Sequence, residues 1–189
     1  MHADNWANKA KQEGYRTRAV YKLDEIIQKT KVLKKKQNIL DLGSAPGGWS
    51  QYVKKKSPSS EIFAIDILDM EPLDGVHFFL KSIEQIHEID QIHSIKGSFG
   101  LVISDIAPNI TGINAIDLEN IYELNCLTLD TAVEYLDKSN GSFIMKTFQN
   151  SMLKNLRKKM ELSFKIVQTF KPAASKKQSG EIYLYGAYK

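Results

Sequence analysis

Three acidic residues stand at or near the ends of short apolar runs, where they could bind a nucleoside-like ligand. Asp41 lies within residues 38–42, Asp66 follows the apolar part of residues 61–67, and Asp105 follows a run that begins at Gly100. Open α/β sheets bind ligands at the carboxyl ends of their strands, where an acid can accept ribose hydroxyls. Asp41 and Asp66 therefore suit a ligand that carries an amine and a ribose, although Asp66 could instead cap a helix.

The loop Gly43-Ser-Ala-Pro-Gly-Gly-Trp49 joins the first apolar run to a segment compatible with a helix. Gly43 and Gly47 lack a Cβ, so the backbone can pass close to a ligand, and the helix behind offers unpaired N–H groups. Ala45 stands where the dinucleotide fingerprint G-x-G-x-x-G requires its second glycine. This argues against a nicotinamide oxidoreductase, whereas an ordinary tight turn between strand and helix stays open.

Length and composition predict one globular domain over residues 1–189. The chain is 42% hydrophobic and 25% charged, and its net charge of +4 is compatible with a polyanionic partner. A single cysteine, Cys126, excludes an internal disulfide and fits a reducing compartment. No apolar run approaches the length of a membrane span and no signal peptide is evident. We therefore expect a cytoplasmic protein, or a mitochondrial one if a transit peptide has been removed.

Strand-like and helix-like segments alternate, which predicts a mostly parallel sheet with helices on both faces. The last two strands are close together and predict a terminal antiparallel hairpin. The predicted strands are residues 38–42, 61–67, 76–80, 100–105, 141–148, 165–170 and 181–188. The predicted helices are residues 4–30, broken at Gly14-Tyr15, then 48–56, an isoleucine ladder over 83–95, 118–137 and 151–163. His87 and His93 are six residues apart and not on one helical face, so no metal site is predicted.

Motifs spread over the whole chain resemble those of the FtsJ-type ribose 2′-O-methyltransferases. The matching segments are Gly14-Tyr-Arg-Thr-Arg-Ala-Val-Tyr-Lys-Leu-Asp-Glu-Ile26, the D-L-G-x-x-P-G-G-W pattern of residues 41–49, Asp66-Ile-Leu-Asp-Met-Glu-Pro72 and Asp105-Ile-Ala-Pro-Asn109. The resemblance implies a Rossmann-like, seven-stranded methyltransferase fold that uses S-adenosylmethionine. The last motif differs from that of methyltransferases acting on base amino groups, so a ribose 2′-hydroxyl of RNA is the implied acceptor.

The resemblance also implies a catalytic quartet made of Lys22, Asp105, Lys146 and Glu181, in which Lys146 is the base. Without the resemblance, a lysine within an apolar strand would equally be expected to point outward. The implied cofactor contacts are Asp41, Gly43, Gly47, Gly48, Trp49, Asp66, Ile67, Ser82 and Asp105. At Ser82 the chain departs from the family, whose members carry an aspartate facing the adenine near this position. Ser82 or a backbone amide would take that place.

Two basic groups precede members of the quartet and predict an RNA-binding rim. Lys9, Lys11, Arg16 and Arg18 precede Lys22, and Lys171, Lys176 and Lys177 precede Glu181. A solvated basic face is the alternative for the first group, and the basic residues 157–159 are the alternative location for RNA binding.

The compact form resembles the enzyme that modifies a uridine of large-subunit ribosomal RNA, acting as a monomer on the ribosomal RNA or on a large-subunit particle. Methyl transfer to the transfer RNA anticodon loop or to the messenger RNA cap stays open, as does a non-catalytic RNA-binding module.

Overall fold

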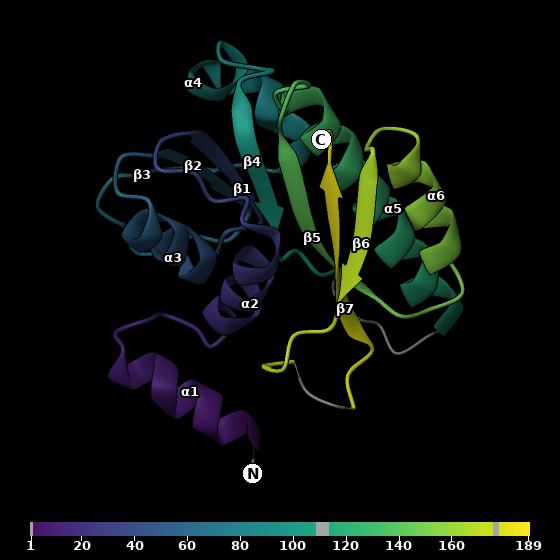
Figure 1. Cartoon of the computed structure of the whole chain (residues 1–189), viewed down its shortest axis with the longest axis horizontal. Helices are drawn as coiled ribbons and strands as arrows, with labels where there is room; N and C mark the ends of the chain where they lie inside the picture. The colour runs from purple at the N-terminus through teal and green to yellow at the C-terminus, as the bar shows by residue number, and fades with distance from the viewer. Residues whose placement is uncertain (1, 109–113, 176–177) are drawn as a thin grey trace.

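Seven strands form one sheet in the order β3-β2-β1-β4-β5-β7-β6 (Figure 1). The computed structural model describes residues 2–108, 114–175 and 178–189. The strands are β1 Asn38–Leu42, β2 Glu61–Asp66, β3 Val76–Leu80, β4 Phe99–Ser104, β5 Ser142–Phe148, β6 Ile166–Phe170 and β7 Glu181–Ala187. Within this sheet β7 runs antiparallel to both of its neighbours, β5 and β6, and the other pairings are parallel. The predicted mostly parallel sheet with an antiparallel C-terminal hairpin is confirmed.

Helices cover both faces of the sheet, as predicted (Figure 1). The helices are α1 His2–Gln12, α2 Val20–Thr30, α3 Gly48–Lys56, the 3₁₀ helix η1 Ile83–Glu88, α4 Asp90–His93, α5 Asn114–Tyr135 and α6 Leu153–Glu161. Side chains alternate between the faces of a strand, so β1 sends Ile39 to the core under α2 and α3 and Leu40 to the core under η1, α4, α5 and α6. Two apolar cores therefore pack against opposite faces of the sheet.

Two predicted helices take a different form in the structure. The segment predicted as helical over residues 4–30 is two helices, because residues 13–19 form turns around Gly14, whose φ is +74°. The isoleucine ladder over residues 83–95 is a 3₁₀ helix followed by the short α4. A spacing of three matches the three residues per turn of a 3₁₀ helix, so successive isoleucines stay on one buried face.

The topology gathers the functional residues at one edge of the sheet. The parallel strands β1, β2, β4 and β5 all end at this edge, and the antiparallel β7 begins there. Glu181, the first residue of β7, pairs with Phe148, the last residue of β5. The site therefore lies at the carboxyl ends of the parallel strands, where α/β sheets bind ligands. Among the described helices, none is long and apolar enough to cross a membrane.

Candidate active site

The loop after β1 is fastened to the end of β2 by backbone and side-chain hydrogen bonds. The N–H groups of Gly43 and Ser44 both donate to Ile65 O, at 2.8 and 3.1 Å. Asp66 Oδ2 accepts from Ala45 N at 2.8 Å, and its Oδ1 accepts from Leu68 N at 2.8 Å. Asp66 therefore caps no helix, and each of its oxygens keeps a lone pair that could accept a ribose hydroxyl.

Glycine is required at two positions of this loop. Gly43 and Gly47 have φ values of +74° and +95°, a conformation that side chains with a Cβ rarely adopt. A Cβ on Gly43 would also lie 1.9 Å from Ile106 Cγ1, in the segment that follows β4. The loop conformation and its close packing therefore both depend on these two residues.

Asp41 is a buried acid with one oxygen left without a partner. Its Oδ2 accepts from Ser50 Oγ at 2.6 Å, whereas its Oδ1 finds no hydrogen-bond donor. Burial raises the pKa of Asp41 to about 7, and the nearby charges of Asp105 and Asp66 add to this rise while the Ser50 hydrogen bonds oppose it. A cationic amine placed against the free oxygen would satisfy it and stabilise the ionised form.

A small cavity of about 40 Å³ lies between this loop, Asp41 and Asp105. It is lined by Thr17, Ala19, Asp41, Gly43, Ser44, Ala45, Pro46, Gly48, Trp49 and Asp105. Five of the predicted cofactor-contact positions therefore meet here, and Asp66 is bonded to the same loop. Gly47, Ile67 and Ser82 do not line the cavity: Gly47 serves the turn of the loop, Ile67 is exposed after β2, and Ser82 Oγ accepts from Glu84 N at the start of η1.

The free oxygen of Asp41 gives a test of whether S-adenosylmethionine fits this place. Its methionyl amine is a cation that suits that oxygen, and its ribose hydroxyls suit the remaining lone pairs of Asp66. The carboxylate oxygens of Asp41 and Asp66 therefore fit the cofactor.

The four predicted catalytic side chains converge as two ion pairs. Lys22 Nζ lies 2.8 Å from Glu181 Oε1 and 3.0 Å from its Oε2. Lys146 Nζ lies 3.2 Å from Asp105 Oδ1 and also donates to the Asp105 backbone carbonyl. Both amines are largely buried, with side-chain exposures of 10% for Lys22 and 11% for Lys146. Lys146 therefore points toward the site and not outward, which decides between the two alternatives left by the sequence.

Tyr183 links the two ion pairs. Its hydroxyl donates to Asp105 Oδ1 at 3.0 Å, and Lys22 Nζ lies 5.9 Å from the centre of its ring. Burial raises the pKa of Tyr183 far above its ordinary value, and the charges of Asp105 and Glu181 raise it further. The hydroxyl therefore stays protonated and acts as a donor.

Glu181 is held as a carboxylate by its surroundings. Burial raises the pKa of this carboxyl, but hydrogen bonds from Lys22 and Ser175 and the charges of Lys22 and Lys146 outweigh burial and lower it overall. Ser175 Oγ donates to Glu181 Oε1 at 2.9 Å. The negative charge that orients Lys22 is thus present at neutral pH.

The predicted RNA rim is described only in part, because Lys176 and Lys177 lie outside the described residues. Lys11, Arg16 and Arg18 line one groove of about 660 Å³, and Thr17 belongs both to this groove and to the small cavity. Lys9 lies elsewhere, 4.6 Å from the centre of the Tyr21 ring.

Arg16 makes contacts that its predicted RNA-binding role did not anticipate. Its guanidinium donates to Pro46 O at 3.0 Å, to Glu71 O at 2.7 Å and to Pro72 O at 2.8 Å. It therefore ties the cofactor loop to the connection between β2 and β3. Lys171 likewise donates to backbone carbonyls, those of Ser179 and Glu181.

Several site residues were not predicted from the sequence. Tyr183 lies two residues after Glu181 on the same strand, and this spacing places both side chains on one face. That periodicity was the available signal. Thr17, Ala19 and Ser44 carried no comparable signal, because they reach the cavity through loops and turns.

Comparisons with known proteins agree with this geometry. A solved structure from Plasmodium falciparum, described as a ribosomal RNA methyltransferase, superposes with a TM-score of 0.80 at 30% identity, covering 92% of this chain and 97% of that one. The structure of human methyltransferase-like protein 13 in complex with SAH has a TM-score of 0.64 at 12% identity, covering 88% and 81%, which shows likeness of fold. The sheet order and the loop after β1 thus define a Rossmann-like methyltransferase.

The family follows from the sequence comparisons. The family model for FtsJ-like methyltransferases matches residues 15–189. The protein called Ribosomal RNA large subunit methyltransferase E from Dechloromonas aromatica is 39% identical over 186 residues, which cover 97% of this chain and 90% of that protein. The protein of the same name from Wigglesworthia glossinidia brevipalpis is 39% identical over 184 residues, with the same coverage. The chain belongs to the FtsJ-like methyltransferase family.

Proposed function

We propose that this protein transfers a methyl group from S-adenosylmethionine to a ribose 2′-hydroxyl of large-subunit ribosomal RNA, at a uridine. The observation that carries the proposal is the convergence of Lys22, Asp105, Lys146 and Glu181 beside the Gly43 loop. Family membership supports methyl transfer, and the names of the two bacterial relatives support this RNA as the substrate.

The residues around the small cavity bind and orient the methyl donor. Asp41 Oδ1 pairs with the methionyl amine, Asp66 accepts the ribose hydroxyls, and the glycine backbone lets the donor approach the loop. When bound, S-adenosylmethionine supplies a methyl group on a positively charged sulfur, which is already a good electrophile. The protein therefore needs chiefly to place the hydroxyl in line with that methyl group.

The two ion pairs place the acceptor and handle its proton. Lys146 Nζ, once it has released its own extra proton to solvent, would take the proton of the 2′-hydroxyl as that oxygen accepts the methyl group. Asp105 holds Lys146 on one side, and Tyr183 fixes Asp105. Lys22, oriented by Glu181, donates hydrogen bonds to the ribose at the acceptor position.

The groove lined by Lys11, Arg16 and Arg18 supplies part of the surface that receives the RNA, because Thr17 connects it to the small cavity. Phosphates entering this groove would meet positive charge close to the catalytic quartet. We place the enzyme in the cytoplasm as a monomer, with the ribosomal large subunit or its precursor as partner.

Methyl transfer to large ribosomal subunits from a strain lacking the enzyme tests the proposal. The protein and tritiated S-adenosylmethionine should label the large-subunit RNA, and mapping should place the label on one uridine ribose. Transfer RNA and capped messenger RNA should stay unlabelled in the same assay. Labelling of either of these instead of ribosomal RNA would overturn the substrate, and RNA binding without any transfer would indicate a binding module.

A further inference from the structure

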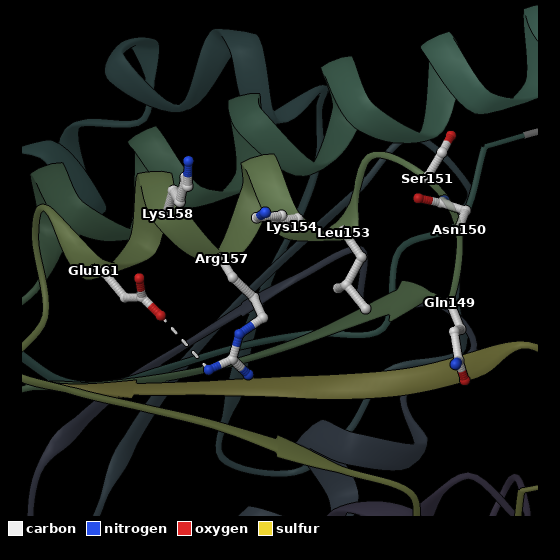
Figure 2. A pocket seen from close by; sticks show the side chains of 8 residues that line it. All are labelled: Gln149, Asn150, Ser151, Leu153, Lys154, Arg157, Lys158 and Glu161. Carbon is white, nitrogen blue, oxygen red and sulfur yellow. Dashed lines mark ion pairs between the residues drawn. The ribbon is translucent and has the colours of Figure 1, made fainter.

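A second basic groove lies beside α6, separate from the cavity and from the groove of residues 11–18. It has a volume of about 510 Å³ and is lined by Gln149, Asn150, Ser151, Leu153, Lys154, Arg157, Lys158 and Glu161. Figure 2 shows Gln149, Asn150 and Ser151 at one end and Glu161 at the other, with the basic side chains between them. The groove therefore has a polar end and a basic middle.

The polar end of this groove adjoins the catalytic edge of the sheet. Gln149 directly follows β5, the strand that carries Lys146, and its N–H donates to Gly180 O at 2.7 Å. Gly180 immediately precedes Glu181, a member of the quartet. Asn150 Oδ1 accepts from Met152 N at 2.9 Å, which leaves its amide hydrogens as donors. An RNA strand held at the quartet can thus continue directly into the groove.

The basic middle of the groove has positive charge in excess. Lys154 and Lys158 are exposed and four residues apart, so they share one side of α6, and neither forms an ion pair or hydrogen bond with another described residue. Glu161, the acid in the lining, pairs with Arg157 at 3.5 Å. Arg157 also donates to Thr169 and Val167 on β6, which fixes it as the floor of the groove. Two uncompensated positive charges remain for a partner.

We infer that this groove binds the sugar-phosphate backbone of the RNA next to the methylated nucleotide. The inference rests on the proposed function, since it extends the substrate contact beyond the quartet. The groove of residues 11–18 lies on the face of the sheet covered by α2 and α3, whereas α6 covers the other face. The RNA therefore crosses the strand ends, with the target ribose at the quartet and phosphates held on both faces.

Phosphates fit this groove by the chemistry of its lining. Lys154 and Lys158 supply point charges, and the amides of Gln149 and Asn150 supply neutral donors at the end nearest the ribose. Apolar area is limited to Leu153 and the stems of the long side chains, which gives a folded protein partner little to bury.

The test compares two double variants that remove the same charge. Lys154→Ala with Lys158→Ala empties the groove of its unpaired charges, and Lys35→Ala with Lys36→Ala is the matched control. Lys35 and Lys36 are exposed and precede β1, at the opposite edge of the sheet. All four sites are on the surface, so both variants should fold, and thermal unfolding will check this. Methyl transfer from tritiated S-adenosylmethionine is measured on naked large-subunit RNA and on large subunits, both lacking the modification.

The groove variant should raise KM for RNA about tenfold at 0.15 M salt and lower the log–log salt slope of RNA binding by about 1 to 2 units. Its kcat and its KM for S-adenosylmethionine should stay within about twofold of wild type, as should every value of the control. Wild-type KM and salt slope in the groove variant would overturn the inference while leaving the proposed function intact.

Two further outcomes separate the remaining cases. A defect with assembled subunits but not with naked RNA would overturn the inference in favour of a ribosomal protein contact. If wild-type protein transfers no methyl group, the proposed function fails. Filter binding of the same naked RNA then tests the groove inference by itself. An unchanged salt slope in the groove variant would overturn the inference, and a reduced slope would support it.

Discussion

The loop that receives the methyl donor and the quartet that receives the acceptor differ in how the chain builds them. The loop is one continuous stretch, and its shape comes from Gly43 and Gly47 and from hydrogen bonds to the end of β2. The quartet joins side chains from four places in the chain, and its two outermost members, Lys22 and Glu181, are 159 residues apart.

We call the loop the donor half of the site and the quartet the acceptor half. Substitutions should impair these two halves in different ways. The loop depends on backbone conformation, so a change in its supports should weaken cofactor binding by degrees. The quartet depends on charges held in pairs, so loss of one charge leaves its partner buried and unpaired. Substitutions in the two halves should accordingly alter different kinetic constants.

The largest effect is expected from Lys146→Ala. Removing the proposed base should lower kcat by about a thousandfold, within the range of 10²–10⁴ for general acid–base catalysis, while the Kd of S-adenosylmethionine changes little. Single-turnover methyl transfer and calorimetry measure the two quantities. Asp66→Ala is the matched variant on the donor side, and it should weaken cofactor binding while keeping most of the single-turnover rate at saturating cofactor.

Two results would contradict this separation. Substantial single-turnover activity in Lys146→Ala would remove this lysine from the chemistry. An unchanged cofactor Kd in Asp66→Ala would show that the ribose is held elsewhere.

The sequence predicted the donor half more directly than the acceptor half, for a physical reason. A positive φ favours glycine wherever it occurs, so Gly43 and Gly47 could be interpreted without knowing the fold. The strand-terminal acids followed from the ends of apolar runs. From the strand pattern by itself, the side chain of Lys146 could point outward or inward. Only the resemblance to a family assigned this lysine to a quartet.

Other features could not be predicted because they depend on tertiary contacts. The three carbonyls bound by Arg16 are 30 to 56 residues away in the chain, and no local pattern indicates such a contact. The isoleucine spacing indicated burial correctly, but a helix of 3.6 residues per turn was assumed where the chain forms a 3₁₀ helix. The insertion of β7 between β5 and β6 likewise follows from sheet assembly.

A second, intermediate effect should appear as a dependence of cofactor binding on pH. Asp41 has its pKa raised to about 7, chiefly by burial, and only its ionised form pairs with the cofactor amine. Affinity for S-adenosylmethionine should therefore increase as pH rises from 6 to 8 and level off above that. Asp41→Asn should bind the cofactor roughly tenfold more weakly at pH 8 and show little of this pH dependence. Calorimetric titration at several pH values measures both.

The same carboxyl should also affect stability, with the opposite sign. An acid whose pKa is higher in the folded state binds more protons when folded, so its contribution falls as pH rises from about 4 to about 7. In the absence of cofactor, wild type should lose stability relative to Asp41→Asn across this window. A parallel pH dependence of unfolding in both proteins would show that Asp41 ionises normally.

The smallest effect is expected from Arg16→Ala, and it tests whether a basic residue between the two halves serves the donor or the acceptor. Its guanidinium supports the cofactor loop through Pro46 O and the β2–β3 connection through Glu71 O and Pro72 O. These contacts are exposed, so water can replace them at modest cost, and KM for S-adenosylmethionine should rise only about fivefold. The salt slope of RNA binding should stay at the wild-type value. Lys11→Ala, in the same groove, should show the reverse: an unchanged cofactor KM and a slope lowered by about one unit or less. If Arg16→Ala behaves like Lys11→Ala, the guanidinium leaves the loop to bind phosphate, and the loop keeps its shape without it.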